Sequence, residues 1–114
     1  MADAPRLICA GAELAEGGSG VRFERELGGR SEPAFVIRYD GQARAFFNSC
    51  AHVAVELDWR PGVFFDADGL YLVCATHGAL YDPATGACAG GPCQGRGLTP
   101  LAVREVDGNI FLED

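Results

Sequence analysis

Cys50-Ala51-His52 and Cys74-Ala75-Thr76-His77 are the two short motifs on which the fold of this chain depends, and they contain the only two histidines of the sequence. Twenty-one residues separate the two motifs. Two thiolates and two imidazoles form a set of soft and borderline metal ligands, which suits iron-sulfur chemistry or zinc rather than calcium or magnesium. The ligand types alone leave iron and zinc open.

The distribution of the ligands distinguishes between these two metals. Structural zinc sites usually pair Cys with Cys and His with His at short spacings. Here each motif contributes one Cys and one His instead. This layout suits a two-iron cluster in which both thiolates bind one iron and both imidazoles bind the other.

With this layout the sequence resembles the Rieske family of iron-sulfur proteins. Residues 74–82, CATHGALYD, are similar to the second cluster loop of that family, and Gly90-Gly91-Pro92 resembles the proline-containing loop that covers the cluster. The resemblance implies a single Rieske domain over residues 1–114. It also implies a 2Fe-2S cluster, with Pro92 against the metal site and four ligands: Cys50, His52, Cys74 and His77.

Three Asp-Gly pairs predict the main turns of the fold: Asp40-Gly41, Asp68-Gly69 and Asp107-Gly108. An Asp-Gly pair accepts the positive φ angles of a type I′ hairpin turn, and runs of β-forming residues flank each pair. The expected strands are residues 6–10, 21–27, 34–39, 43–47, 63–65, 70–73, 101–106 and 110–112, with one helical turn within 11–15. The pattern predicts an all-β domain, a small antiparallel sandwich or barrel.

Both ligand motifs follow the second strand of a predicted hairpin. Cys50 comes after the strand 43–47, and Cys74 comes directly after the strand 70–73. Loops that leave strand ends can converge at one tip of a rigid sheet. We therefore expect the two ligand loops to form a cluster-binding subdomain.

Tyr81 is a further candidate for the cluster site. It matches a tyrosine that, in high-potential Rieske proteins of respiratory complexes, donates a hydrogen bond to a ligand sulfur. This chain departs from those proteins at Val55 and Thr76, where they have additional cysteines, and at Ala79, where they have a serine. The resemblance therefore implies a low-to-intermediate potential. The alternative is that Tyr81 is an ordinary half-buried aromatic residue.

Three further cysteines remain: Cys9, Cys88 and Cys93. We expect free or buried thiols, with Cys9 as a small apolar residue inside the first strand. A local disulfide between Cys88 and Cys93, or a second metal site there, is the alternative.

Composition narrows the functional classes. A chain of 114 residues with 48% hydrophobic residues forms one domain with its own core. The net charge of -7 excludes a general nucleic-acid binder, and it suits either docking on a basic redox partner or simple solubility. The sequence contains no apolar run long enough for a membrane span and no secretory signal, which predicts a soluble cytoplasmic protein.

The resemblance implies a Rieske-type ferredoxin, a one-electron carrier that performs no bond chemistry and is therefore not an enzyme. Its expected partners are a flavin-containing reductase as donor and a terminal oxygenase of an aromatic-ring-hydroxylating system as acceptor. The alternatives are a small Rieske subunit of an assimilatory nitrite reductase and a structural zinc-binding interaction module. A self-contained oxygenase would need two additional histidines for its mononuclear iron.

Overall fold

The computed structural model describes residues 6–27, 29–48, 57–58, 62–66, 69–74, 78–91 and 97–113. These residues form strands of two to ten residues and 3-10 turns, with no α-helix among them. The elements are β1 (Arg6–Ala10), η1 (Gly11–Glu13), β2 (Val21–Leu27), β3 (Arg30–Tyr39), β4 (Gln42–Phe47), β5 (Leu72–Val73), β6 (Leu80–Tyr81), β7 (Cys88–Gly90), β8 (Pro100–Leu101), β9 (Val103–Val106) and β10 (Asn109–Leu112).

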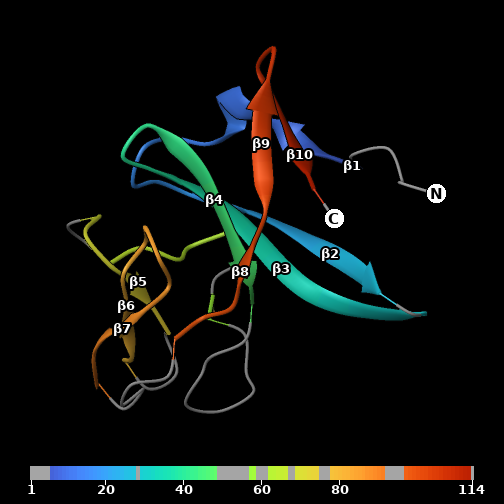
Figure 1. Ribbon diagram of the computed structural model, residues 1–114. Coiled ribbons are helices and arrows are strands. Elements are labelled where there is room, and N and C mark those ends of the chain that lie inside the picture. Colours follow the sequence, from blue (N-terminus) through green and yellow to red (C-terminus); the bar gives the residue numbers. More distant parts are fainter. Residues whose placement is uncertain are drawn as a thin grey trace.

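The strands pair into three sheets, in the orders β1-β10-β9, β2-β3-β4-β8 and β5-β6-β7. Every pair of these strands is antiparallel. Figure 1 shows β5, β6 and β7 grouped on one side of the molecule, away from β1, β9 and β10, with β4 between the two groups. The prediction of an all-β antiparallel domain is confirmed.

Two of the three predicted hairpin turns are confirmed in detail. Asp40 and Gly41 have φ angles of 55° and 75°, and Asp107 and Gly108 have φ angles of 52° and 78°. Left-handed backbone at both central residues defines the type I′ turn, whose twist matches that of the strands on either side. The short Asp side chain tolerates this conformation.

The middle hairpin is looser than predicted. Residues 63–65 do not form a strand, because only Phe65 bridges to Leu72. The Asp66 carboxylate instead accepts the backbone N–H of Leu70 at 2.9 Å, which stabilises a wide turn at the hairpin end. Asp68, half of the predicted turn pair, lies outside the described residues.

The predicted strand 101–106 is also wrong as one continuous element. β8 pairs with β4, whereas β9 pairs with β10 in a different sheet. Ala102 lies between them, and its carbonyl accepts the backbone N–H of Glu113 at 2.9 Å. The chain therefore changes sheets at Ala102, and an alternating sequence pattern carries no information about which partner a strand takes.

The central strand β3 separates two buried cores. Its middle residues Phe35, Val36 and Ile37 are all fully buried, so both faces of the strand are covered. Phe35 and Ile37 belong to a core that we call the site core, which also contains Phe46, Leu57, Phe64, Leu72, Cys74, Ala79, Tyr81 and Leu98. Val36 belongs to the terminal core, with Cys9, Leu14, Ala45 and Ile110.

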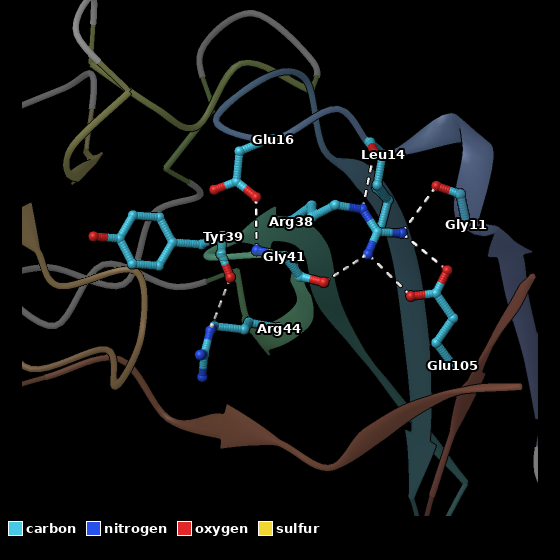
Figure 2. Close-up of polar contacts among 8 residues, drawn as sticks. All are labelled: Gly11, Leu14, Glu16, Arg38, Tyr39, Gly41, Arg44 and Glu105. Carbon is cyan, nitrogen blue, oxygen red and sulfur yellow. Dashed lines mark hydrogen bonds and ion pairs between the residues drawn. The ribbon is translucent and has the colours of Figure 1, made fainter.

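Arg38 joins the first segment and the last hairpin to the central sheet. Its guanidinium pairs with both carboxylate oxygens of Glu105 at 2.9 and 3.0 Å. It also donates to the backbone carbonyls of Gly11 at 3.0 Å, Leu14 at 3.1 Å and Gly41 at 3.3 Å (Figure 2). The Arg38 and Glu105 side chains are 16% and 32% exposed, so water reaches this ion pair. We refer to it as the Arg38 clamp.

Candidate metal centre

Cys74 lies at the end of β5 and is 0% exposed. Its backbone N–H donates to the carbonyl of Ala79 at 2.9 Å, and its own carbonyl accepts the N–H of Gly78 at 2.8 Å. These two hydrogen bonds close the base of the second ligand motif. The predicted ligand Cys74 is therefore a buried thiol held at the foot of a closed loop.

The other predicted ligands Cys50, His52 and His77 lie outside the described residues, as does Pro92. The described residues next to the first ligand motif are Asn48, which follows β4, and Leu57. Leu57 is fully buried in the site core together with Cys74. The chain that leaves the first motif thus returns to the same core that holds the second.

The start of the predicted covering loop lies directly against the second ligand motif. A Cβ atom built on Gly91 would lie 2.9 Å from the carbonyl oxygen of Gly78 and 3.0 Å from the Cα of Ala79. Gly91 also has a φ of 78°, a conformation that favours glycine. A side chain at position 91 would therefore collide with the two residues that follow the second ligand motif, Gly78 and Ala79.

Tyr81 lies on β6, opposite Leu72 of β5 and Cys88 of β7. Its side chain is 0% exposed and packs in the site core with Cys74. The ring is therefore fully buried rather than half-buried, and the choice between a packing role and a hydrogen bond to a ligand sulfur stays a prediction. Among the described residues, no buried side-chain nitrogen or oxygen lacks a hydrogen-bond partner.

Two of the remaining cysteines behave differently. Cys9 is a buried free thiol within β1, as predicted, and burial together with the nearby Glu13 raises its pKa. Cys88 is disulfide-bonded, so the expectation of a free thiol was wrong there. Its bonded cysteine lies outside the described residues, as Cys93 does, so the alternative of a local disulfide between Cys88 and Cys93 stays a prediction.

Sequence reasoning missed Asn48 and Asp58, two buried polar residues beside the first ligand motif. The amide of Asn48 donates to the carboxylate of Asp58 at 2.8 Å. The signal available in the sequence was their placement, since one polar residue precedes the ligand motif and the other follows it.

Within the part of the chain that the structure describes, no helix has the length and apolar character needed to cross a membrane.

The chemistry of the described residues fits a buried sulfur-ligated metal group. Cys74 presents a thiol that the core excludes from water, and glycine backbone packs against its loop on one side. Thiolate is the form that binds soft metals and iron-sulfur clusters. That the two motifs together supply two sulfur and two nitrogen ligands stays a prediction from the sequence.

Comparison with known proteins gives a consistent assignment. The family model "Rieske [2Fe-2S] domain" matches residues 5–107. A search of curated protein sequences found no match.

Similar solved structures include the ferredoxin of Sphingomonas yanoikuyae B1, with 23% identity and a TM-score of 0.77, covering 97% of this chain and 99% of that one. The ferredoxin of carbazole 1,9a-dioxygenase from Nocardioides aromaticivorans IC177 has 22% identity and a TM-score of 0.73, with 97% and 98% coverage. A complex of reduced oxygenase and oxidized ferredoxin in carbazole 1,9a-dioxygenase contains a chain with 24% identity and a TM-score of 0.74, with 93% and 98% coverage. At these identities the likeness establishes the fold.

Proposed function

Because this chain belongs to the Rieske [2Fe-2S] domain family, we propose that it is a ferredoxin that carries one electron at a time. The ligand types alone left iron and zinc open. The family match decides for iron, because the cofactor of the family is a 2Fe-2S cluster. The observation that carries the proposal is the buried Cys74 at the foot of a closed loop, inside a match that spans residues 5–107.

We assign the cluster to two thiolates, from Cys50 and Cys74, and two imidazoles, from His52 and His77. When bound, the cluster supplies a site that gains and loses a single electron, and its two neutral imidazoles raise the reduction potential above that of an all-cysteine cluster. The protein holds the Cys74 sulfur in place through the two backbone hydrogen bonds at the base of its loop. Pro92, in the covering loop Gly90-Gly91-Pro92, would lie against the metal site.

Tyr81 would tune the potential by donating its hydroxyl hydrogen to a ligand sulfur. Its burial in the site core with Cys74 supports this role. A hydrogen bond to a ligand sulfur stabilises the additional negative charge of the reduced state, which raises the potential.

The electron donor would be a flavin-containing reductase, and the acceptor would be the terminal oxygenase of an aromatic-ring-hydroxylating system. Two of the similar structures are ferredoxin components of carbazole 1,9a-dioxygenase, and one of these was solved in complex with an oxygenase. The net charge of -7 would favour docking on a basic partner surface. In this role residues 1–114 act as one cytoplasmic domain, and substrate chemistry takes place on the oxygenase.

Measurements on the purified protein test the cluster first, and electron transfer then tests the partners. Iron and sulfide are counted on the purified protein, and low-temperature EPR is recorded after dithionite reduction. We expect two irons and two sulfides per chain, with a rhombic signal whose average g lies below that of an all-cysteine 2Fe-2S ferredoxin. A colourless, EPR-silent protein that contains zinc would overturn the proposal. Electron delivery from candidate reductases to candidate oxygenases then tests the partners.

A further inference from the structure

Asn48 and Asp58 form a buried bridge between the two ends of the segment that carries Cys50 and His52. Asn48 follows β4, and the carboxylate of Asp58 is 0% exposed. The Asn48 amide nitrogen donates to Asp58 Oδ1 at 2.8 Å. Its amide oxygen accepts the backbone N–H of Leu57 at 2.8 Å. One side chain thus ties the start of the segment to two consecutive residues at its end.

The bridge is anchored to the sheet on both sides. The backbone N–H of Asn48 donates to the carbonyl of Pro33 in β3 at 2.8 Å. Leu57 packs in the site core, which also contains Cys74. Asn48 and Leu57, which flank residues 49–56, are therefore held in place relative to the buried thiol of the second motif.

The second oxygen of Asp58 completes the network. Asp58 Oδ2 accepts the backbone N–H of Gly62 at 2.9 Å and lies 3.4 Å from Arg22 Nε. The Arg22 side chain is 39% exposed, so the buried carboxylate has a partly hydrated counter-ion. A buried charge is costly unless it is paired and hydrogen-bonded. The ion pair to Arg22 and the hydrogen bonds from Asn48 and Gly62 together meet that need.

We propose that Asn48 and Asp58 are positioning residues for the first ligand motif, holding the ends of its segment so that Cys50 and His52 are placed for the cluster. The inference rests on the proposed function. Bringing two points of a chain together costs conformational entropy, and two points already held together leave less of that cost to cluster assembly. Groups that support metal ligands typically change metal affinity by about 10–100-fold when they are removed.

A double-mutant cycle separates this role from general stabilisation. Asn48→Asp places two carboxylates against each other, and Asp58→Asn leaves the Asn48 amide and Gly62 competing for one oxygen. The swapped variant, N48D with D58N, restores the set of hydrogen bonds. In the swap the amide nitrogen at position 58 would donate to the carboxylate at position 48, which would also accept the Leu57 N–H. The amide oxygen at position 58 would accept the Gly62 N–H.

The cycle is measured on cluster-loaded protein by two readouts. The first is the rate of iron release to a ferrous chelator under dithionite. We expect about tenfold faster release for N48D, a smaller increase for D58N, and a rate within about twofold of wild type for the swap. The second is hydrogen–deuterium exchange by mass spectrometry of peptides that contain Leu57 and Gly62. This exchange should rise in N48D and D58N and recover in the swap.

Glu105→Gln is the matched control, because it weakens the Arg38 clamp in the other core without touching the segment. It should lower the midpoint of urea unfolding while leaving iron release and the EPR g values as in wild type. If the control accelerates iron release as much as N48D does, or if the swap performs no better than N48D, the bridge is only a stabilising contact and the inference fails.

If N48D does not fold, D58N and the swap decide by the same readouts. A wild-type chain that takes up no iron overturns the proposed function, and with it this inference, whereas loaded wild type with unaffected variants overturns the inference alone.

Discussion

Among the described residues, the site core contains buried Cys74 and the terminal core contains buried Cys9, and the comparison shows how position gives the same residue type different roles. Cys74 in the site core is the last residue before a loop, immediately after β5. Cys9 in the terminal core is 7% exposed and lies within β1, opposite Ile110 of β10. A thiol inside a strand packs as a small apolar group. A thiol at the end of a strand is placed where it can bind a metal.

The polar networks of the two cores differ in the same way. The Asn48–Asp58 bridge is buried, with its charge removed from water. The Arg38 clamp stays partly exposed, and water screens it (Figure 2). Breaking one member of a buried network leaves an unsatisfied group, while an exposed ion pair can fall back on hydration. Similar polar contacts therefore carry different consequences in the two regions.

The largest expected effect comes from replacing each of the two buried cysteines, Cys74 and Cys9, by serine in separate variants. Cys74→Ser should abolish the cluster, because the variant lacks one of the two sulfur ligands assigned to it. Cys9→Ser should retain the cluster and lose only stability, since its thiol fills the terminal core. Iron content and the EPR signal measure both variants. Equal cluster content in the two variants would remove the distinction between the cores.

The next effect tests the close approach of the covering loop. Gly91→Ala adds a Cβ atom 2.9 Å from the Gly78 carbonyl, and we expect faster loss of iron to a chelator. Gly108→Ala is the matched control: both glycines have a φ of 78°, but no atom lies within 4 Å of a Cβ at Gly108. Both changes should cost about 1–2 kcal/mol of stability from the left-handed backbone. Only the first should affect the cluster.

A smaller effect is expected from Glu105→Gln, which weakens the Arg38 clamp beside the terminal core. The hydrogen bond from Arg38, aided by its charge, lowers the pKa of Glu105 below its ordinary value of 4.5. A carboxyl whose pKa falls on folding stabilises the folded state above the ordinary pKa, and this contribution disappears as pH falls through the folded-state pKa. Urea unfolding should show the variant less stable by about 1 kcal/mol at neutral pH and low salt. The difference from wild type should shrink as pH falls below 4.5, and a constant difference would contradict the assignment.

The smallest structural change is Tyr81→Phe, which removes a single hydroxyl from the site core. We expect a lower reduction potential in protein-film voltammetry, because the reduced cluster loses a hydrogen bond to one ligand sulfur. Iron content should stay at the wild-type level. Tyr39→Phe is a useful control, since Tyr39 only packs against the site core from its edge. An unchanged potential in the Tyr81 variant would leave that residue a packing role alone.

The sequence by itself determined the features that depend on neighbouring residues. The Asp-Gly turns at Asp40 and Asp107 follow from the φ angles that those residues accept, and the strands that flank these two turns follow from runs of β-forming residues. The ligand motifs were visible for the same reason, because each lies within a few consecutive residues.

The tertiary structure alone decided the features that depend on distant partners. The change of sheets at Ala102 and the bridge from Asn48 to Asp58 both depend on contacts that the local sequence pattern does not encode. Gly91 likewise required glycine because of Gly78 and Ala79, which precede it by a whole hairpin. Burial and hydrogen bonding between residues so far apart in the sequence form only when the sheets pack against one another. The surroundings of Cys74 depend on that packing.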